Sequence, residues 1–452
     1  MPYMVKKKNM KLWDKGTEVN KQIEKFTVGK DRELDMFLAE HDIVGSMAHC
    51  IMLENIGLLT TNELVDIKTE LRNIYQLNKD GKLSIDEGVE DIHSQIELLL
   101  TQKLGDTGKK IHNGRSRNDQ VLLDLKLFIR LEIKDVVEST QELFNSFIKQ
   151  SEKYKNILMP GYTHLQVAMP SSFGLWFGAY AESLTDDMQL LLSAYKIANQ
   201  NPLGSAAGYG SSFPLNRQLT TDLLGFDQMN YNVVYAQMGR GKLERVVAYA
   251  LSSIAATISK FSMDVNLFMS QNMGFISLPD ELTTGSSIMP HKKNPDVFEL
   301  LRAKCNKIQA LPNEIMLITN NLPLGYFRDL QIIKENFIPV FNEMKENVEI
   351  LNFMLSKIKV KDNIVEDKKY EYLFSVEEVN KRVVAGMPFR DAYKEVGLDI
   401  EKGNFNPEKT INHTHEGSIG NLCNDKISDK MQRIVKEFNF EKVEKAVNKL
   451  ME

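Results

Sequence analysis

The hydrophobic positions of the chain predict several long helices. Residues 120–159 contain no glycine or proline, and their apolar side chains recur at helical spacing. This pattern predicts a helix of up to roughly 60 Å. Residues 242–273 form a second such stretch, in which apolar positions cover too much of the circumference for a single buried face. We expect this second helix to be buried nearly all round.

Capping residues predict two further helices. Ser171 or Ser172 can cap a third helix that ends near Asn201, and Asp296 starts a fourth helix directly after a proline. Long helices joined by glycine-rich loops, without the alternating pattern of short strands, favour a mainly helical bundle. Because one chain can hardly cover helices that are apolar on several faces, we expect those faces to pack against other subunits.

The length of 452 residues favours about three domains. We place an N-terminal helical domain at residues 1–112, a central domain of long helices at 113–362 and a small helical domain at 363–452. The polar segment 76–87 resembles a calcium loop, but Gln76 stands where such a loop needs a carboxylate. His413 and His415 are too isolated to form a metal site. The sequence therefore predicts no bound metal.

Charge and cysteine content narrow the class of protein. The chain has 56 basic and 61 acidic residues, a net charge of −5, with both signs mixed along its length. Nucleic acid is therefore not expected as a partner. The three cysteines are far apart and odd in number, which is typical of a reducing compartment and favours the cytoplasm. No apolar run predicts a signal peptide or a membrane-spanning helix.

Three glycine-punctuated polar segments interrupt the long helices. The segment 112–120 precedes the first long helix, and its backbone N–H groups with Arg115 and Arg117 could hold carboxylates. The alternative is an elaborate helix cap formed by Asn118 or Asp119. Both interpretations are compatible with the segment taken alone.

The other two segments contain groups suited to acid–base chemistry. Segment 160–166 reads as a polar loop ending a helix, and its His164 is suited to proton transfer near neutral pH, although a lone loop histidine usually has no function. Segment 285–295 contains paired serines and paired lysines. Its glycine and prolines are equally typical of a flexible surface loop.

Taken in this order, the three segments resemble the fumarase and aspartase superfamily of lyases. Segment 285–295 carries the signature G-S-S-x-M-P-x-K-x-N-P without a gap. Within the superfamily, H-N-G-R-S-R-N-D-Q and G-Y-T-H-L-Q are similar to the argininosuccinate lyase family, as are residues 323–331 and 386–390. The resemblance implies an all-α, three-domain fumarase/aspartase-like fold. It also implies a homotetramer whose long central helices form one bundle, with active sites shared between three subunits.

The resemblance implies a reversible β-elimination that splits argininosuccinate into arginine and fumarate without a cofactor. A base must remove a proton from a carbon next to a carboxylate, so the resulting anion needs strong stabilisation. By the family's pattern Ser287 is this base. Lys293 and the backbone N–H groups of the segment could favour both the serine alkoxide and the carbanion intermediate, helped by close approach of the backbone at Gly285. His164, held by Glu299, would protonate or orient the leaving group of the substrate.

The family's pattern also implies a set of substrate contacts. Arg117 and Asn118 would bind carboxylate oxygens of the substrate. Thr163 and Asn294 would bind its fumarate-forming end. The remaining contacts implied by position are Tyr326, Gln331 and Lys334 at the arginine-forming end, together with Arg115, Ser116, Asp91 and His93. His291 and Asn113 depart from the usual residues of the family without removing a catalytic group.

Two other functions stay open at this point. A lyase acting on adenylosuccinate would share the loop chemistry, although the segment 112–120 has the arginine-type sequence. A catalytically inactive structural homologue is the second alternative, although Ser287, Lys293 and His164 are all present. Following fumarate formation from each candidate substrate would separate these possibilities.

Overall fold

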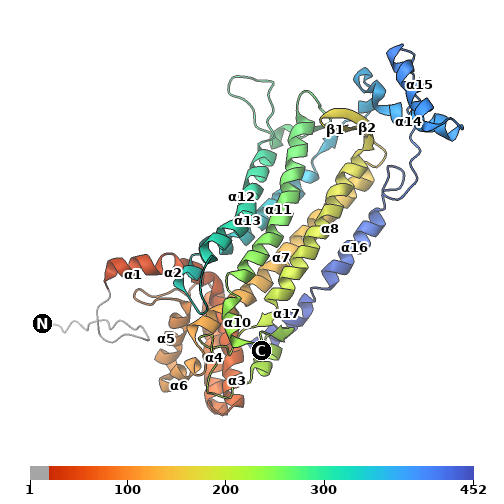
Figure 1. The fold of residues 1–452 in the computed structure, drawn as a ribbon. Helices are drawn as coiled ribbons and strands as arrows, with labels where there is room; N and C mark the ends of the chain where they lie inside the picture. The colour runs from red at the N-terminus through yellow and green to blue at the C-terminus, as the bar shows by residue number, and fades with distance from the viewer. Residues whose placement is uncertain (1–19) are drawn as a thin grey trace.

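Long helices lie side by side and form the centre of the molecule (Figure 1). The computed structural model describes residues 20–452. The long helices are α7 (Arg117–Lys153), α8 (Phe173–Ala198), α11 (Lys242–Met269), α12 (Asp296–Thr319) and α13 (Lys334–Leu355). One continuous apolar core runs between them, with the rings of Trp176 and Phe261 stacked 5.1 Å apart. The predicted helical fold is confirmed.

The helix expected over residues 120–159 ends earlier than predicted. α7 stops at Lys153, and the chain then forms an antiparallel hairpin of β1 (Leu158–Thr163) and β2 (Gln166–Ser172). Each strand contains a proline, which hides the strand pattern in the sequence. The expectation of a chain without short strands is wrong here. At the end of β2, Ser172 caps α8 by accepting from the N–H of Leu175 at 3.1 Å, as predicted.

α11 is buried along most, but not all, of its circumference. Leu251, Ile254 and Phe261 are fully buried, whereas Tyr249 and Met263 are 55% and 47% exposed. One chain therefore leaves a stripe of this helix uncovered. By length and composition α11 could cross a membrane, but 56% of its most apolar window is buried inside the chain, as in the core helix of a soluble protein.

A second apolar core joins the N-terminal helices to the lower end of the bundle in Figure 1. Side chains of α3 (Ala39–Asn55), α4 (Thr61–Lys79), α5 (Ile92–Leu104) and α9 (Arg217–Leu223) contribute to it. The short helices α1 (Lys21–Val28), α2 (Asp31–Asp35), α6 (Asp106–Lys109) and α10 (Val233–Met238) contribute no side chain to this core. Side chains of α7 enter this core at Leu123 and Leu127. The start of α7 is thus fixed firmly to the N-terminal helices.

The C-terminal ninety residues spread along the whole length of the bundle. α14 (Ser375–Val384) and α15 (Phe389–Glu401) form a small lobe at the end that carries the hairpin (Figure 1). α16 (Asn424–Lys436) packs along α8, and α17 (Phe440–Met451) returns to α3. The proposed domain boundaries stay a prediction. Short strand pairs complete the fold: β3 (Gln200–Asn201) with β4 (Gln228–Met229), and β5 (Ile276–Ser277) with β6 (Lys359–Val360).

Candidate active site

The predicted site residues lie at opposite ends of the bundle. Arg117 is the first residue of α7, while His164 follows the end of that helix in the β1–β2 hairpin (Figure 1). α7 has 37 residues, which at about 1.5 Å per residue separates the two ends by roughly 55 Å. Arg117 and His164 of one chain therefore cannot contact the same small molecule.

At the N-terminal end, Ser116 caps α7. Its hydroxyl accepts from the N–H of Asn118 at 3.3 Å, and its own N–H donates to the carboxylate of Asp119 at 2.8 Å. Asp119 also accepts from the N–H groups of Gly204 and Ala206. Burial raises the pKa of Asp119 to about 6, against the effect of these hydrogen bonds. The capping interpretation is therefore right for Asp119, and it leaves the amide of Asn118 for other contacts.

The two arginines of this segment already have partners. Arg117 lies 3.1 Å from both Glu90 and Asp91 and donates to Ser94 at 2.8 Å. Arg115 donates to the hydroxyl of Ser46 on α3 at 3.1 Å. Glu90 was not among the predicted site residues, because the sequence has several acidic residues near this position. These contacts orient the arginine side chains before a substrate binds.

His93 lies in a buried cluster of charged groups. Its Nδ1 is 3.1 Å from Asp42 Oδ1 and 3.4 Å from Asp124 Oδ2, and the side chain is 4% exposed. Burial lowers the pKa of His93, but the two carboxylates outweigh it and raise the pKa to about 9. Asp42 also accepts from Gln120 Nε2. The cluster ties α3, α5 and α7 together. Sequence reasoning missed Asp42 and Asp124, which are carboxylates within otherwise apolar stretches of α3 and α7.

Lys334 is buried as well. Its side chain is 4% exposed, with Nζ 2.9 Å from Asp31 and 2.7 Å from Asp35. Burial raises the pKa of Asp31, and the lysine opposes that shift. This arrangement joins the first residue of α13 to α2.

Tyr326 and Gln331 both contact a buried arginine, Arg240. Arg240 donates to Gln331 Oε1 at 3.1 Å, and its guanidinium carbon lies 5.7 Å from the ring centre of Tyr326. Arg328 pairs with Glu90 at 3.2 Å, and Glu90 also pairs with Arg117. The structure thus joins two of the three residues predicted for the arginine-forming end, Tyr326 and Gln331, through Arg240, while the side chain of Lys334 pairs only with Asp31 and Asp35 among residues 20–452. Sequence reasoning missed Arg240, although the glycines on both sides of it mark a break before α11.

At the other end, the hairpin presents Thr163 and His164 to solvent. Thr163 pairs with Gln166, and the two residues between them, His164 and Leu165, have φ of +54° and +58°. These angles are those of a tight two-residue hairpin turn, which is uncommon without glycine or asparagine. His164 therefore sits at the tip of a hairpin, not in an irregular loop at a helix end as predicted.

The loop that carries the signature, residues 285–295, is closed at its base by backbone hydrogen bonds and exposed at its tip. Thr284 and Asn294 exchange two backbone hydrogen bonds of 3.2 and 2.8 Å. Ser287 and Lys293 are exposed, and Lys293 pairs with Asp280. Nothing lies within 4 Å of a Cβ built on Gly285, so the chain itself does not make the close approach expected there.

Several predicted pairs do not meet within one chain. Glu299 is exposed on the first turn of α12. No hydrogen bond or ion pair among residues 20–452 joins it to His164, or joins Lys293 to Ser287. The sequence-predicted groups are therefore divided between an assembled N-terminal end and an exposed hairpin end.

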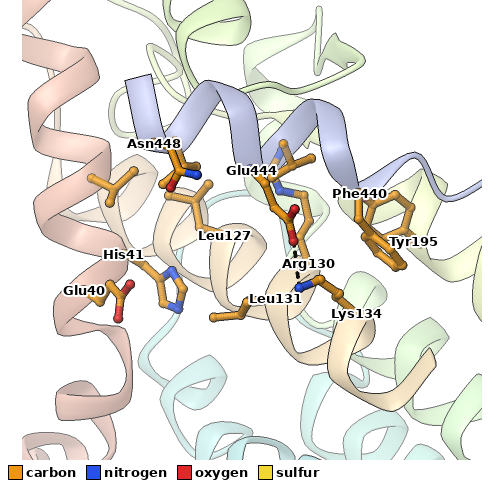
Figure 2. A pocket seen from close by; sticks show the side chains of 13 residues that line it. Glu40, His41, Leu127, Arg130, Leu131, Lys134, Tyr195, Phe440, Glu444 and Asn448 are labelled. Carbon is orange, nitrogen blue, oxygen red and sulfur yellow. Dashed lines mark ion pairs between the residues drawn. The ribbon is translucent and has the colours of Figure 1, made fainter. Parts of the chain in front are cut away.

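A cavity of about 200 Å³ lies away from both groups, between α3, α7, α8 and α17 (Figure 2). Its walls are mainly apolar, and Lys134 pairs with Glu444 across it at 2.7 Å. Burial lowers the pKa of His41 on its α3 wall to about 4, so this imidazole is neutral at pH 7. None of the predicted site residues lines this cavity.

Comparison with known proteins shows the class of enzyme to which the chain belongs. The profile of a family described as lyase matches residues 14–310. An EDDS lyase variant with bound fumarate superposes with a TM-score of 0.76 at 20% identity, covering 96% of this chain and 95% of that one. A class II fumarase from Schistosoma mansoni superposes with 0.69 at 16% identity, over 92% and 94%. The fold is that of the fumarase and aspartase superfamily.

Sequence relatives narrow the class further. An argininosuccinate lyase from Bacteroides fragilis is 66% identical over 98% of this chain and 99% of its own length. One from Thermotoga neapolitana is 41% identical over 85% and 97%. The chain belongs to the argininosuccinate lyase family and is a carbon–nitrogen lyase. The resemblance deduced from the motifs is confirmed, and neither alternative function is favoured.

Proposed function

We propose that this lyase splits argininosuccinate reversibly into arginine and fumarate without a cofactor. The observation that carries the proposal is the division of the family's motif residues into a binding set and a reacting set. Arg117, Tyr326 and Gln331 form the first set at one end of the bundle, and Ser287 and His164 belong to the second set at the other. Both sets retain the groups that a β-elimination needs.

We infer that the active enzyme is a homotetramer in which neighbouring subunits complete each site. The roughly 55 Å length of α7 supports this, because the two sets cannot meet within one chain. Large apolar side chains exposed on the bundle helices also support it: Tyr249, Met263, Leu300 and Leu317 are 55%, 47%, 61% and 63% exposed. With its three free cysteines, the enzyme is expected in the cytoplasm.

In the proposed mechanism Ser287 removes a proton from the carbon next to a carboxylate of the substrate. The C–H electron pair becomes delocalised into that carboxylate, where Lys293 and backbone N–H groups of the loop stabilise the negative charge. Lys293 must exchange its contact with Asp280 for this role. The electrons then form the carbon–carbon double bond of fumarate as the carbon–nitrogen bond breaks.

The departing guanidino nitrogen takes the electron pair of the broken bond. His164, oriented by Glu299 of another subunit, would supply or guide the proton that it needs. Its exposed position at a rigid hairpin tip suits a group that completes a neighbour's site.

Substrate binding combines residues of both ends. Arg117 and Asn118 would bind carboxylate oxygens, with Thr163 and Asn294 at the fumarate-forming end. At the arginine-forming end we propose Tyr326, Gln331 and Lys334. Asp91, Arg115, Ser116 and His93 complete the set, although Lys334 and His93 are almost fully enclosed by carboxylates.

Offering the purified protein argininosuccinate, adenylosuccinate, aspartate and malate separately, while following fumarate, tests the proposal. We expect turnover of argininosuccinate alone. Turnover of adenylosuccinate alone would overturn the substrate, and no turnover of any compound would favour a structural role.

A further inference from the structure

The cavity of about 200 Å³ in Figure 2 is lined by none of the residues proposed above for the reaction. Leu131 on its wall is 43% exposed, so the cavity is open to solvent on that side. An apolar cavity of about 150 Å³ is large enough to bind benzene. The cavity therefore has room for one substituted ring. Its apolar lining residues on α3, α7 and α17 are Val44, Leu127, Leu131, Phe440, Val443 and Val447.

His41 adds a polar ring to this apolar wall. It is 9% exposed, and its ring packs edge-on against Phe128 with ring centres 5.9 Å apart. Neither ring nitrogen has a hydrogen-bond partner among residues 20–452, and both remain accessible, unlike the shielded Nε of Arg130. Buried polar groups nearly always have a partner. Because the imidazole is neutral, one nitrogen donates and the other accepts, and the missing partner indicates a ligand with one polar group.

The charged groups around the cavity balance one another. Lys134 pairs with Glu444 at 2.7 Å, and Glu40 pairs with Lys79, which lies outside the cavity, at 2.7 Å. Arg130 is 3% exposed and donates to an amide oxygen and a backbone carbonyl. Two cations and two anions thus line the cavity. A neutral ligand fits this balance, because a charged ligand would lose its hydration without gaining a free counter-ion.

One side of the cavity is aromatic. Phe440 of α17 packs edge-to-face on Tyr195 of α8, with ring centres 5.2 Å apart and an angle of 77° between the rings. Figure 2 shows these two rings on the side of the cavity opposite His41. Aromatic rings contribute more to such contacts than their buried area alone. The aromatic side therefore favours an aromatic ligand over an aliphatic one.

We propose that this cavity binds one small neutral aromatic molecule, of the size of phenol, whose single hydrogen-bonding group pairs with His41. The ligand contacts α3, α7 and α17 at once, so binding stabilises the packing of the C-terminal helix on the bundle. This inference is independent of the reaction proposed above, because it requires no turnover.

Calorimetric titration of the full-length enzyme with phenol and with toluene, which lacks a hydrogen-bonding group, tests the proposal. We expect one saturable phenol site per chain that excess toluene blocks. His41→Phe keeps the ring and should weaken phenol binding about fivefold, the contribution of one hydrogen bond, with toluene binding unchanged within about twofold. His415→Phe is the matched control, because His415 is exposed and outside the cavity. Val447→Phe fills the cavity and should weaken both ligands at least about tenfold.

The proposal is overturned if phenol shows no saturable binding, because water or a neighbouring subunit then fills the cavity. It is also overturned if His41→Phe binds phenol as tightly as the unmodified enzyme, or if His415→Phe loses as much affinity. Thermal melting and gel filtration verify that each variant folds and assembles. The competition between phenol and toluene needs no variant, and phenol that toluene cannot displace would refute a shared site.

Discussion

The two ends of the bundle differ in how much of the site a single chain prepares. At the N-terminal end, Lys334 is enclosed by two carboxylates and Arg117 by two more. At the hairpin end, Ser287 and His164 are exposed, and no side-chain hydrogen bond holds either of them within residues 20–452. The binding residues of the N-terminal end are thus pre-organised by the chain's own fold. The reacting residues depend on assembly and substrate for their environment.

The largest effect is expected at the exposed end. Ser287→Ala should lower kcat by about 10³-fold, because a positioned base contributes roughly 10² to 10⁴. The melting temperature should hardly change, since Ser287 is exposed. Steady-state kinetics and thermal melting measure both quantities. Ser286→Ala is the control, and a Ser287→Ala enzyme that keeps most of its activity would remove this residue from the base role.

Mixed tetramers test whether the two ends belong to one site. Asn118→Asp places a negative charge among substrate carboxylates, and His164→Ala removes the hairpin imidazole, so each homotetramer should be nearly inactive. Subunits dissociated together and reassembled in equal amounts should recover about a quarter of the normal activity, because two different subunits must each supply an intact residue. Recovery of no activity would contradict sites shared between chains.

Lys293→Ala should lower kcat by at least about 10²-fold, by analogy with the loss of one donor to a developing anion. Asp280→Asn serves as its counterpart, because it frees Lys293 from its ion pair without removing the cation. We expect Asp280→Asn to leave kcat within about twofold, since exposed ion pairs contribute little. An equal loss in both variants would assign the effect to the loop's structure.

Breaking an ion pair should reduce the free energy of unfolding more at the N-terminal end than at the hairpin end. Asp35→Ala leaves the buried Lys334 with Asp31 alone and should reduce the free energy of unfolding by about 3 kcal/mol. Asp280→Ala breaks an exposed pair and should change it by less than about 0.5 kcal/mol. Urea denaturation measures both changes. Equal losses would show that the N-terminal end is no better organised than the hairpin end.

The buried cluster around His93 makes stability depend on pH. Its pKa of about 9 in the folded chain lies above the ordinary value of 6.5, so the folded state binds this proton more tightly. The resulting stability, on the order of 3 kcal/mol, is complete below about pH 6.5 and is lost as the pH rises to about 9. Urea denaturation across this range should show the decline. A His93→Gln variant with the same decline would assign it to other groups.

The local residue pattern predicted the long helices of the bundle well, but it did not predict the segments that connect them. Helical spacing without glycine or proline predicted the start of α11, and a serine after proline predicted the cap of α8 at Ser172. The predicted extension of α7 to residue 159 was wrong, because pairing with β2 gives residues 158–163 hydrogen bonds that a helix prediction cannot anticipate. Strand pairing is decided by a partner segment, not by the strand itself.

The sequence by itself determined the family, the helical periods and the chemical groups available to the site, because these depend on residue type and short spacing. Only the tertiary structure showed that α7 carries Arg117 and His164 to opposite ends of a rigid bundle. It also showed that Arg240 contacts both Gln331 and the ring of Tyr326. Distances between segments follow from helix direction and packing, which no local run of residues specifies.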